Sequence, residues 1–175
     1  AEDYGAIPNH YLLATTGLSA SGKTCVSAAM AEELGLIRLR SDVERKRLHG
    51  LGRVAVPTPG YREHGHAWQR ADFDVVGISA EQALADDLSW LDSVDVVVWI
   101  NPNNPTGQVL APERLLAWRE RLARRGGWLV VDEAFIEGLP DHRLDPWAGA
   151  ANLVILRSLG KFFGLAGIRA GAVLL

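Results

Sequence analysis

The sequence has few cysteines and no long apolar run. Cys25 is the single cysteine among 175 residues, so no disulfide can form within the chain, which suits a reducing compartment. No apolar run approaches the roughly 20 residues of a membrane-spanning helix. Residues 1–10 also lack the basic and then apolar pattern of a signal peptide. These absences predict a cytoplasmic protein with no membrane partner.

The chain also lacks an excess of positive charge. Its 18 Lys and Arg residues are outnumbered by 21 Asp and Glu residues, and the formal net charge is −3. Because nucleic-acid-binding surfaces are usually basic, we expect no nucleic-acid partner. The hydrophobic content of 48% is ordinary for a globular protein. The length predicts one domain, residues 1–175.

Short apolar runs alternate with amphipathic segments along the chain. Apolar runs at 94–100, which Asp95 alone interrupts, and at 153–156 predict buried strands. Residues 112–125 predict a helix whose inner face carries Leu115, Trp118 and Leu122. Further strands are predicted at 11–15, 53–56, 73–78 and 128–131, and further helices at 22–34, 61–71 and 80–91. This alternation predicts an α/β fold with three layers, α/β/α, around a mostly parallel sheet.

Polar side chains follow five of the predicted strands at their carboxyl ends. The carboxyl ends of parallel strands meet at one edge of a sheet, where open α/β sheets bind their ligands. The polar residues concerned lie at 17–23, 61–64, 104, 132 and 158–161. Lys161 taken alone would be an ordinary surface lysine, but its place after a buried strand and beside these loops predicts a functional site.

Three motifs follow one another in the second half of the chain. They are NPNNPTG at 101–107, VVDEAF at 130–135 and SLGKFFGLAGIRAG at 158–171. In this order they resemble the fold-type I pyridoxal-phosphate (PLP) enzymes of the aminotransferase superfamily. The sequence PTPGYREHGHAW at 57–68, with Phe135, is more similar to threonine-phosphate decarboxylases than to histidinol-phosphate aminotransferases. The resemblance covers residues 52–175 and extends to 1–16.

The resemblance implies three residues that would act on the ring and substrate. Lys161 would hold PLP covalently, acting as nucleophile and proton shuttle. Asp132 would pair with the pyridine nitrogen and keep it protonated, so that the ring withdraws electrons from the α-carbon. Asn104 would bond to the phenolic oxygen of the ring.

Three more residues would hold the cofactor in place. Ser158 and Arg169 would bind its phosphate, the arginine through charge-assisted hydrogen bonds. His64 would stack on the face of the ring.

The resemblance also implies an activity and an arrangement. The parent activity is decarboxylation of a small amino-acid phosphate, in a protein that pairs as a homodimer. The last strand would run antiparallel inside the sheet. Relatives continue into a smaller C-terminal domain, so a PLP-binding but inactive chain is one expectation.

Residues 17–24, GLSASGKT, depart from the resemblance. They fit the phosphate-loop pattern G-x-x-x-x-G-K-[ST] at every position. The candidate phosphate ligands are Gly17, Ser19, Ser21, Gly22, Lys23 and Thr24. Residues 17–51 look like the start of a small P-loop kinase, so the chain resembles a chimera in which a kinase-like βα element lies between PLP-enzyme segments 1–16 and 52–175.

Two other functions are therefore left open by the sequence. The loop could hold ATP with magnesium or the phosphate of PLP, because both ligands need backbone amides at a helix N-terminus. In the ATP interpretation WLVVDE at 128–133 would be a Walker B strand, with Asp132 on magnesium. The third possibility is a folded, non-catalytic chimeric scaffold.

Overall fold

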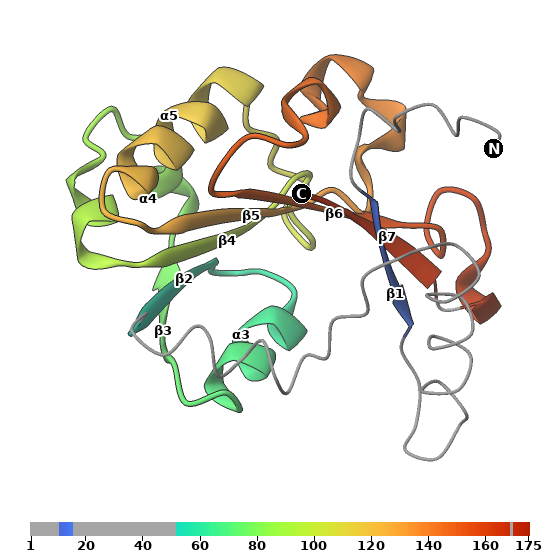
Figure 1. Ribbon diagram of the computed structural model, residues 1–175, viewed down its shortest axis with the longest axis horizontal. Helices are drawn as coiled ribbons and strands as arrows, with labels where there is room; N and C mark the ends of the chain where they lie inside the picture. The colour runs from blue at the N-terminus through green and yellow to red at the C-terminus, as the bar shows by residue number, and fades with distance from the viewer. Residues whose placement is uncertain (1–10, 16–51, 169) are drawn as a thin grey trace, which may run out of the picture.

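The computed structural model describes residues 11–15, 52–168 and 170–175 of the chain (Figure 1). The predicted helix at 22–34 and the six candidate phosphate ligands between positions 17 and 24 lie outside the described residues, as does Arg169. Within the described part, no helix is long and apolar enough to cross a membrane.

A seven-stranded sheet forms the centre of the described structure. Its strands are β1 (Tyr11–Thr15), β2 (Arg53–Pro57), β3 (Asp74–Ile78), β4 (Val96–Ile100), β5 (Trp128–Asp132), β6 (Leu153–Ser158) and β7 (Ala170–Leu174). They are arranged in the order β1-β7-β6-β5-β4-β2-β3. Strands β2 to β6 are mutually parallel, whereas β7 is antiparallel to both of its neighbours, β6 and β1. The mostly parallel sheet and the antiparallel, interior last strand are as predicted.

Helices cover both faces of the sheet, which makes the predicted three layers (Figure 1). α3 (Arg62–Gln69) lies on one face, and α5 (Pro112–Ala123) lies on the other with the short turns of the connection after β5. The remaining elements are α4 (Ala80–Leu84) and the 3₁₀ turns η1 (Ser89–Ser93), η2 (Ile136–Gly138), η3 (Pro140–His142), η4 (Asp145–Trp147) and η5 (Ala166–Ile168).

β4 is the strand around which both cores form. All five of its residues are buried, as its continuous apolar run predicts. Because side chains alternate along a strand, Val97 and Trp99 join the core beneath α5, whereas Val96 and Val98 join the smaller core beneath α3. In the larger core the ring of Trp118, from α5, packs edge-to-face on Trp99 with 5.2 Å between centroids.

The predicted helix at 80–91 is wrong beyond its first turns. α4 ends at Leu84, Ala85 is extended, and the chain resumes only as the 3₁₀ turn η1. The backbone N–H and the hydroxyl of Ser89 both donate to the carboxylate of Asp87, at 2.8 and 2.9 Å. Such local side-chain bonds compete with helical ones, which explains the break.

β7 approaches β6 closely at one glycine. A Cβ atom at Gly171 would lie 2.5 Å from the carbonyl oxygen of Arg157. Only glycine therefore fits at this position, directly opposite Ser158 in the sheet register.

Candidate functional site

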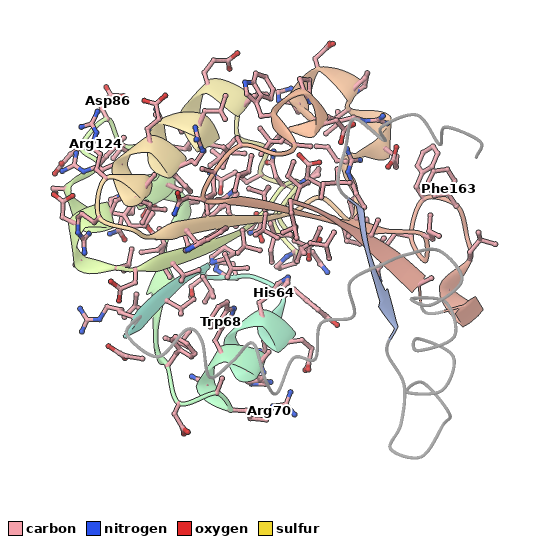
Figure 2. All side chains as sticks on the ribbon, in the orientation of Figure 1. His64, Trp68, Arg70, Asp86, Arg124 and Phe163 are labelled. Atoms are coloured by element: carbon pink, nitrogen blue, oxygen red, sulfur yellow. The ribbon has the colours of Figure 1, made fainter. Side chains whose placement is uncertain are left out.

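Asp132 lies at the carboxyl end of β5, and its carboxylate is held from two sides. The side chain is 16% exposed. Its Oδ1 accepts a hydrogen bond from the backbone N–H of Ala134 at 2.9 Å, and its Oδ2 is hydrogen-bonded to Nε2 of His64 at 2.7 Å. His64 comes from the first turn of α3 and points toward the sheet (Figure 2). The carboxylate is therefore fixed in orientation but still reachable.

His64 makes a hydrogen bond in addition to the ring-stacking role that the resemblance implies, and that stacking role stays a prediction. Its ring uses Nε2 to bind the carboxylate of Asp132, which makes it a support for that residue. Tyr61, at the N-cap of α3, meets the His64 ring edge-on with 5.8 Å between centroids. Because Tyr61 is 51% exposed, it presents a more accessible aromatic surface here than His64 does. The sequence places Tyr61 in a polar loop but predicts no role for it.

Lys161 lies in the exposed loop after β6, next to the loop that follows Asp132. Its Nζ is 5.4 Å from the centroid of the Phe135 ring, within the range of a cation–π contact. Phe135 is three residues beyond Asp132 and is itself 43% exposed. The loop after β6, which carries Lys161, therefore lies beside the loop after β5. This is expected because the carboxyl ends of parallel strands meet at one edge of a sheet.

Ser158 ends β6 at the same edge of the sheet. Its Oγ accepts a hydrogen bond of 3.2 Å from the N–H of Gly160, which shapes the first turn of the lysine loop. A Cβ atom at Gly160 would lie 3.3 Å from Cα of Ala166, so the two ends of this loop pack closely. Ser158 is half-buried, and its hydroxyl is adjacent to the loop that carries Lys161.

Asn104 is exposed on the loop that follows β4. Two other asparagines of the same motif fix this loop. Asn101 is fully buried, donates to the carbonyl of Leu110 at 3.1 Å and accepts from the N–H of Leu110 at 2.8 Å. Asn103 donates to the carbonyl oxygen of Pro59 at 2.9 Å and so ties this loop to the one that leads into α3.

The roles of Asn101 and Asn103 are not predicted by the sequence. The signal was present as three asparagines within NPNNPTG. Only burial distinguishes them: Asn101 and Asn103 are 0% and 3% exposed, whereas Asn104 is exposed. An asparagine that satisfies a loop backbone and one that faces a ligand look alike in sequence.

The carboxyl end of β1 lies at this same edge. β1 is antiparallel to β7 and β7 is antiparallel to β6, so β1 runs in the direction of the parallel strands. Thr15 pairs with Ala170, next to the pairing of Ser158 with Gly171. Residues 17–24 follow β1 in the sequence and lie outside the described part of the chain.

A buried charged group lies directly behind the site. Glu133 is 1% exposed and accepts a hydrogen bond from the N–H of Leu144 at 2.9 Å. Burial raises the pKa of the Glu133 carboxyl to about 7, and the Arg157 guanidinium 3.1 Å away opposes that rise. From sequence, Glu133 is only part of an Asp-Glu pair in a possible Walker B strand, and no role is predicted for Arg157.

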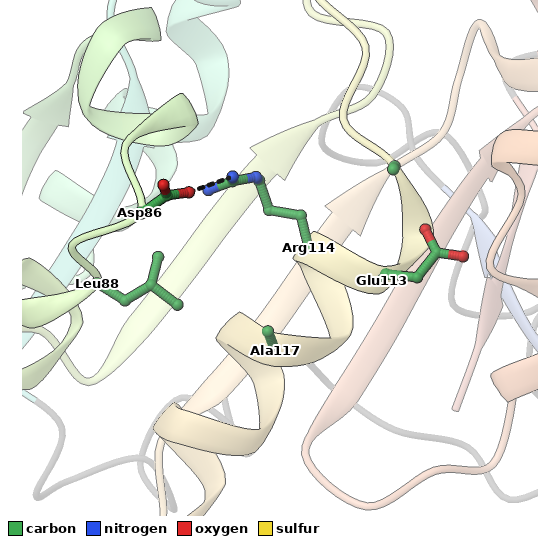
Figure 3. Close-up of a pocket in the computed structure, with 6 residues that line it drawn as sticks. Asp86, Leu88, Glu113, Arg114 and Ala117 are labelled. Carbon is green, nitrogen blue, oxygen red and sulfur yellow. Dashed lines mark hydrogen bonds and ion pairs between the residues drawn. The ribbon is translucent and has the colours of Figure 1, made fainter.

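The candidate site is distinct from the hollow shown in Figure 3. That hollow, of about 390 Å³, lies between α5 and the segment after α4. Arg114 spans it toward Asp86, with 3.5 Å between Nη2 and Oδ1. None of the predicted site residues lines it. In the described part of the chain, no three His, Cys, Asp or Glu side chains are grouped as a metal site would need.

The chemistry of the sheet edge suits a PLP molecule. It offers an exposed amine at Lys161, an oriented and partly shielded carboxylate at Asp132, an exposed amide at Asn104 and a hydroxyl at Ser158. PLP presents a carbonyl for an amine, a ring nitrogen for a carboxylate and a phenolic oxygen for an amide. The donor set therefore fits the group.

Comparison with known proteins gives the family. Residues 47–175 match the model of the aminotransferase class I and II family, and the chain belongs to that family. The threonine-phosphate decarboxylase of Pseudomonas aeruginosa is 51% identical over 123 residues, which are 70% of this chain and 36% of that protein. The chain thus spans about a third of the length of this curated relative.

Solved structures agree with the fold. The histidinol-phosphate aminotransferase from Clostridium acetobutylicum superposes with a TM-score of 0.64 at 23% identity, over 90% of this chain and 52% of that one. The PLP-dependent cyclase OrfR superposes with a TM-score of 0.60 at 33% identity, over 70% of this chain and 35% of that one. The family and its PLP-dependent members indicate PLP as the cofactor.

Proposed function

We propose that this chain is the PLP-binding part of an enzyme that removes the carboxylate of an amino-acid phosphate. The similarity to a threonine-phosphate decarboxylase, at 51% identity, supports this reaction over transamination. The observation that carries the proposal is the sheet edge itself. There the Asp132 carboxylate, oriented by His64, ends β5, and Phe135 in the loop that follows it contacts the Lys161 amine.

Each residue of the proposed site has a separate task. The Lys161 amine binds the cofactor covalently, and Asp132 keeps a proton on its ring nitrogen. His64 and the N–H of Ala134 hold the Asp132 carboxylate in one orientation, so this charge needs no rearrangement when the ring binds. When bound, PLP supplies an electron sink for the electrons left at the α-carbon by the departing carboxylate.

The remaining predicted residues position the cofactor. Asn104 binds the phenolic oxygen, while Ser158 and Arg169 bind the phosphate, and the exposed ring of Tyr61 offers a surface for stacking. The substrate is a small amino-acid phosphate. The protein forms a homodimer, and size-exclusion chromatography with light scattering tests this by measuring its molar mass in solution.

The proposal is tested by adding PLP to the protein. We expect a visible absorption band that borohydride fixes, with the label mapped by peptide mass spectrometry to Lys161. Lys161→Ala should lose both band and label, because the other two lysines, Lys23 and Lys46, belong to the segment that departs from the PLP-enzyme resemblance. Lys46→Ala is the matched control and should keep them. A band that persists in Lys161→Ala would contradict the assignment.

Nucleotide binding by residues 17–24 stays a prediction of the sequence. A titration with ATP and magnesium distinguishes nucleotide binding from the proposed function. ATP with magnesium is added to the wild type and to Lys23→Ala. Tight binding that Lys23→Ala abolishes, in a protein that takes up no PLP, would favour the kinase-like interpretation. A protein that binds neither PLP nor ATP would favour the interpretation as a non-catalytic scaffold.

A further inference from the structure

Arg157, on β6, binds three carboxylates from a single stretch of chain. Its side chain is 13% exposed. Nη1 donates to Oε1 of Glu137 at 2.8 Å, and Nη2 lies 3.1 Å from Oε2 of Glu133 and also donates to Asp145. All three acids lie between positions 133 and 145, in the connection that leads from β5 to β6. One guanidinium therefore fastens this connection to β6.

The residues next to Arg157 and Glu133 in the chain are those of the proposed site. Arg157 precedes Ser158, and Glu133 follows Asp132. In the sheet register Asp132 pairs with Leu156, so Asp132 and Ser158 lie on one face. The N–H of Glu133 also donates to the carbonyl of Leu156 at 2.9 Å. Arg157 is therefore on the opposite face of the sheet from Asp132 and Ser158.

Stability alone is a poor reason for such an arrangement. Buried ion pairs gain little net free energy, because removing the charges from water offsets most of their attraction. In some proteins such buried charged groups instead fix one structural arrangement. Arg143 also belongs to the cluster and donates to the carbonyl and carboxylate of Glu137, but neither it nor Glu137 adjoins a site residue.

We propose, building on the function proposed above, that Arg157 is a positioning residue of the cofactor site. By holding the 133–145 connection against β6, it sets the separation between Asp132 and the loop that runs from Ser158 to Lys161. The residue touches neither substrate nor cofactor, and it acts through the backbone of the two strands.

Two backbone amides report this geometry in the cofactor-free protein. The N–H of Ala134 donates to Asp132, and the N–H of Gly160 donates to Ser158. We expect Arg157→Met to accelerate hydrogen exchange at both amides by about tenfold through local opening, while the amides of β4 are unaffected. The dissociation constant for PLP should also rise by about tenfold, which is the scale of the loss when residues that support metal ligands are removed.

Arg143→Met is the matched control, because it removes a neighbouring guanidinium from the same cluster. It should leave the Ala134 and Gly160 amides and PLP binding unchanged. If Arg157→Met fails to fold, Arg157→Lys serves in its place, since it keeps the charge but lacks the planar fork whose Nη1 and Nη2 reach separate carboxylates. Wild-type exchange at both amides in the Arg157 variant, or equal acceleration in the Arg143 control, would overturn the proposal.

The two proposals fail separately. If wild-type Lys161 takes up no PLP, the proposed function fails, yet the exchange of the two amides still decides whether Arg157 sets this geometry. If Lys161 takes up PLP and the Arg157 variant binds it as tightly as the wild type, only the positioning role is lost.

Discussion

Burial controls the charge of Glu133 at the residue scale. The carboxyl is almost fully buried, and this raises its pKa to about 7 in the folded protein. In the unfolded chain water solvates it, and the ordinary value of about 4.5 applies. The folded state therefore binds a proton more tightly than the unfolded state between these two values, and Arg157 only partly offsets the cost of the buried charge.

This difference predicts how stability depends on pH. The contribution of Glu133 to the free energy of unfolding is fully present below pH 4.5 and is lost as pH rises through about 7. The loss amounts to about 3 kcal/mol. Glu133→Gln cannot titrate, so its free energy of unfolding should rise relative to the wild type by about this amount between pH 4.5 and pH 8. Urea unfolding across that range measures it, and a constant difference between the two proteins would refute the raised pKa.

At the scale of elements, two buried asparagine side chains hold the loop after β4 in place. Asn101 closes it by pairing through its amide with both backbone groups of Leu110. Asn103 then fastens it to the turn at Pro59 that starts α3. α3 carries His64 and this loop carries Asn104. The hydrogen bond from Asn103 to Pro59 therefore fixes the position of one part of the site relative to the other.

Removing the Asn101 amide should therefore cost stability. Asn101→Ala leaves the buried N–H and carbonyl of Leu110 without partners, and each unsatisfied group costs about 1–3 kcal/mol. We expect the free energy of unfolding to fall by about 2–5 kcal/mol, as measured by urea denaturation.

Asn104→Ala is the control, because that side chain is exposed. It should change stability by no more than about 0.5 kcal/mol. Equal losses in Asn101→Ala and Asn104→Ala would mean that the buried amide does not close the loop.

At the scale of the whole molecule, the central strands of the sheet are its most stable part. β4 is buried on both faces and lies between β2 and β5, whereas β3 pairs on one side only with β2. Protection from exchange follows burial and pairing, so we expect the amides of β4 and β5 to exchange last and those of β3 earlier. Hydrogen exchange followed by mass spectrometry gives this order, and a β3 as protected as β4 would contradict it.

Most of the fold was predictable because its signals are local. The continuous apolar run of β4 and the amphipathic pattern of α5 each follow from a few neighbouring residues, and both elements are present. The helix at 80–91 failed because hydrogen bonds between Asp87 and Ser89 outweigh its weak periodicity. Periodicity alone does not register such bonds.

The candidate site was predictable in its position but not in its contacts. The ends of parallel strands placed Asp132, Ser158 and Lys161 at one edge in advance. The bond between His64 and Asp132 joins residues far apart in the chain, and nothing in the sequence near either residue indicates it. The role of Arg157 was likewise hidden, because its partners are gathered only once the 133–145 connection folds back on β6.

The position of β7 between β1 and β6 also affects the order in which this sheet can form. β1 pairs only with β7, and Thr15 finds its partner in Ala170, near the other end of the sequence. A ribosome delivers the chain from its amino end, so residues 11–15 must wait for nearly the whole of this sequence before their hydrogen bonds can close. Closing so long a loop is slow, and β1 should therefore be the last strand to join the sheet.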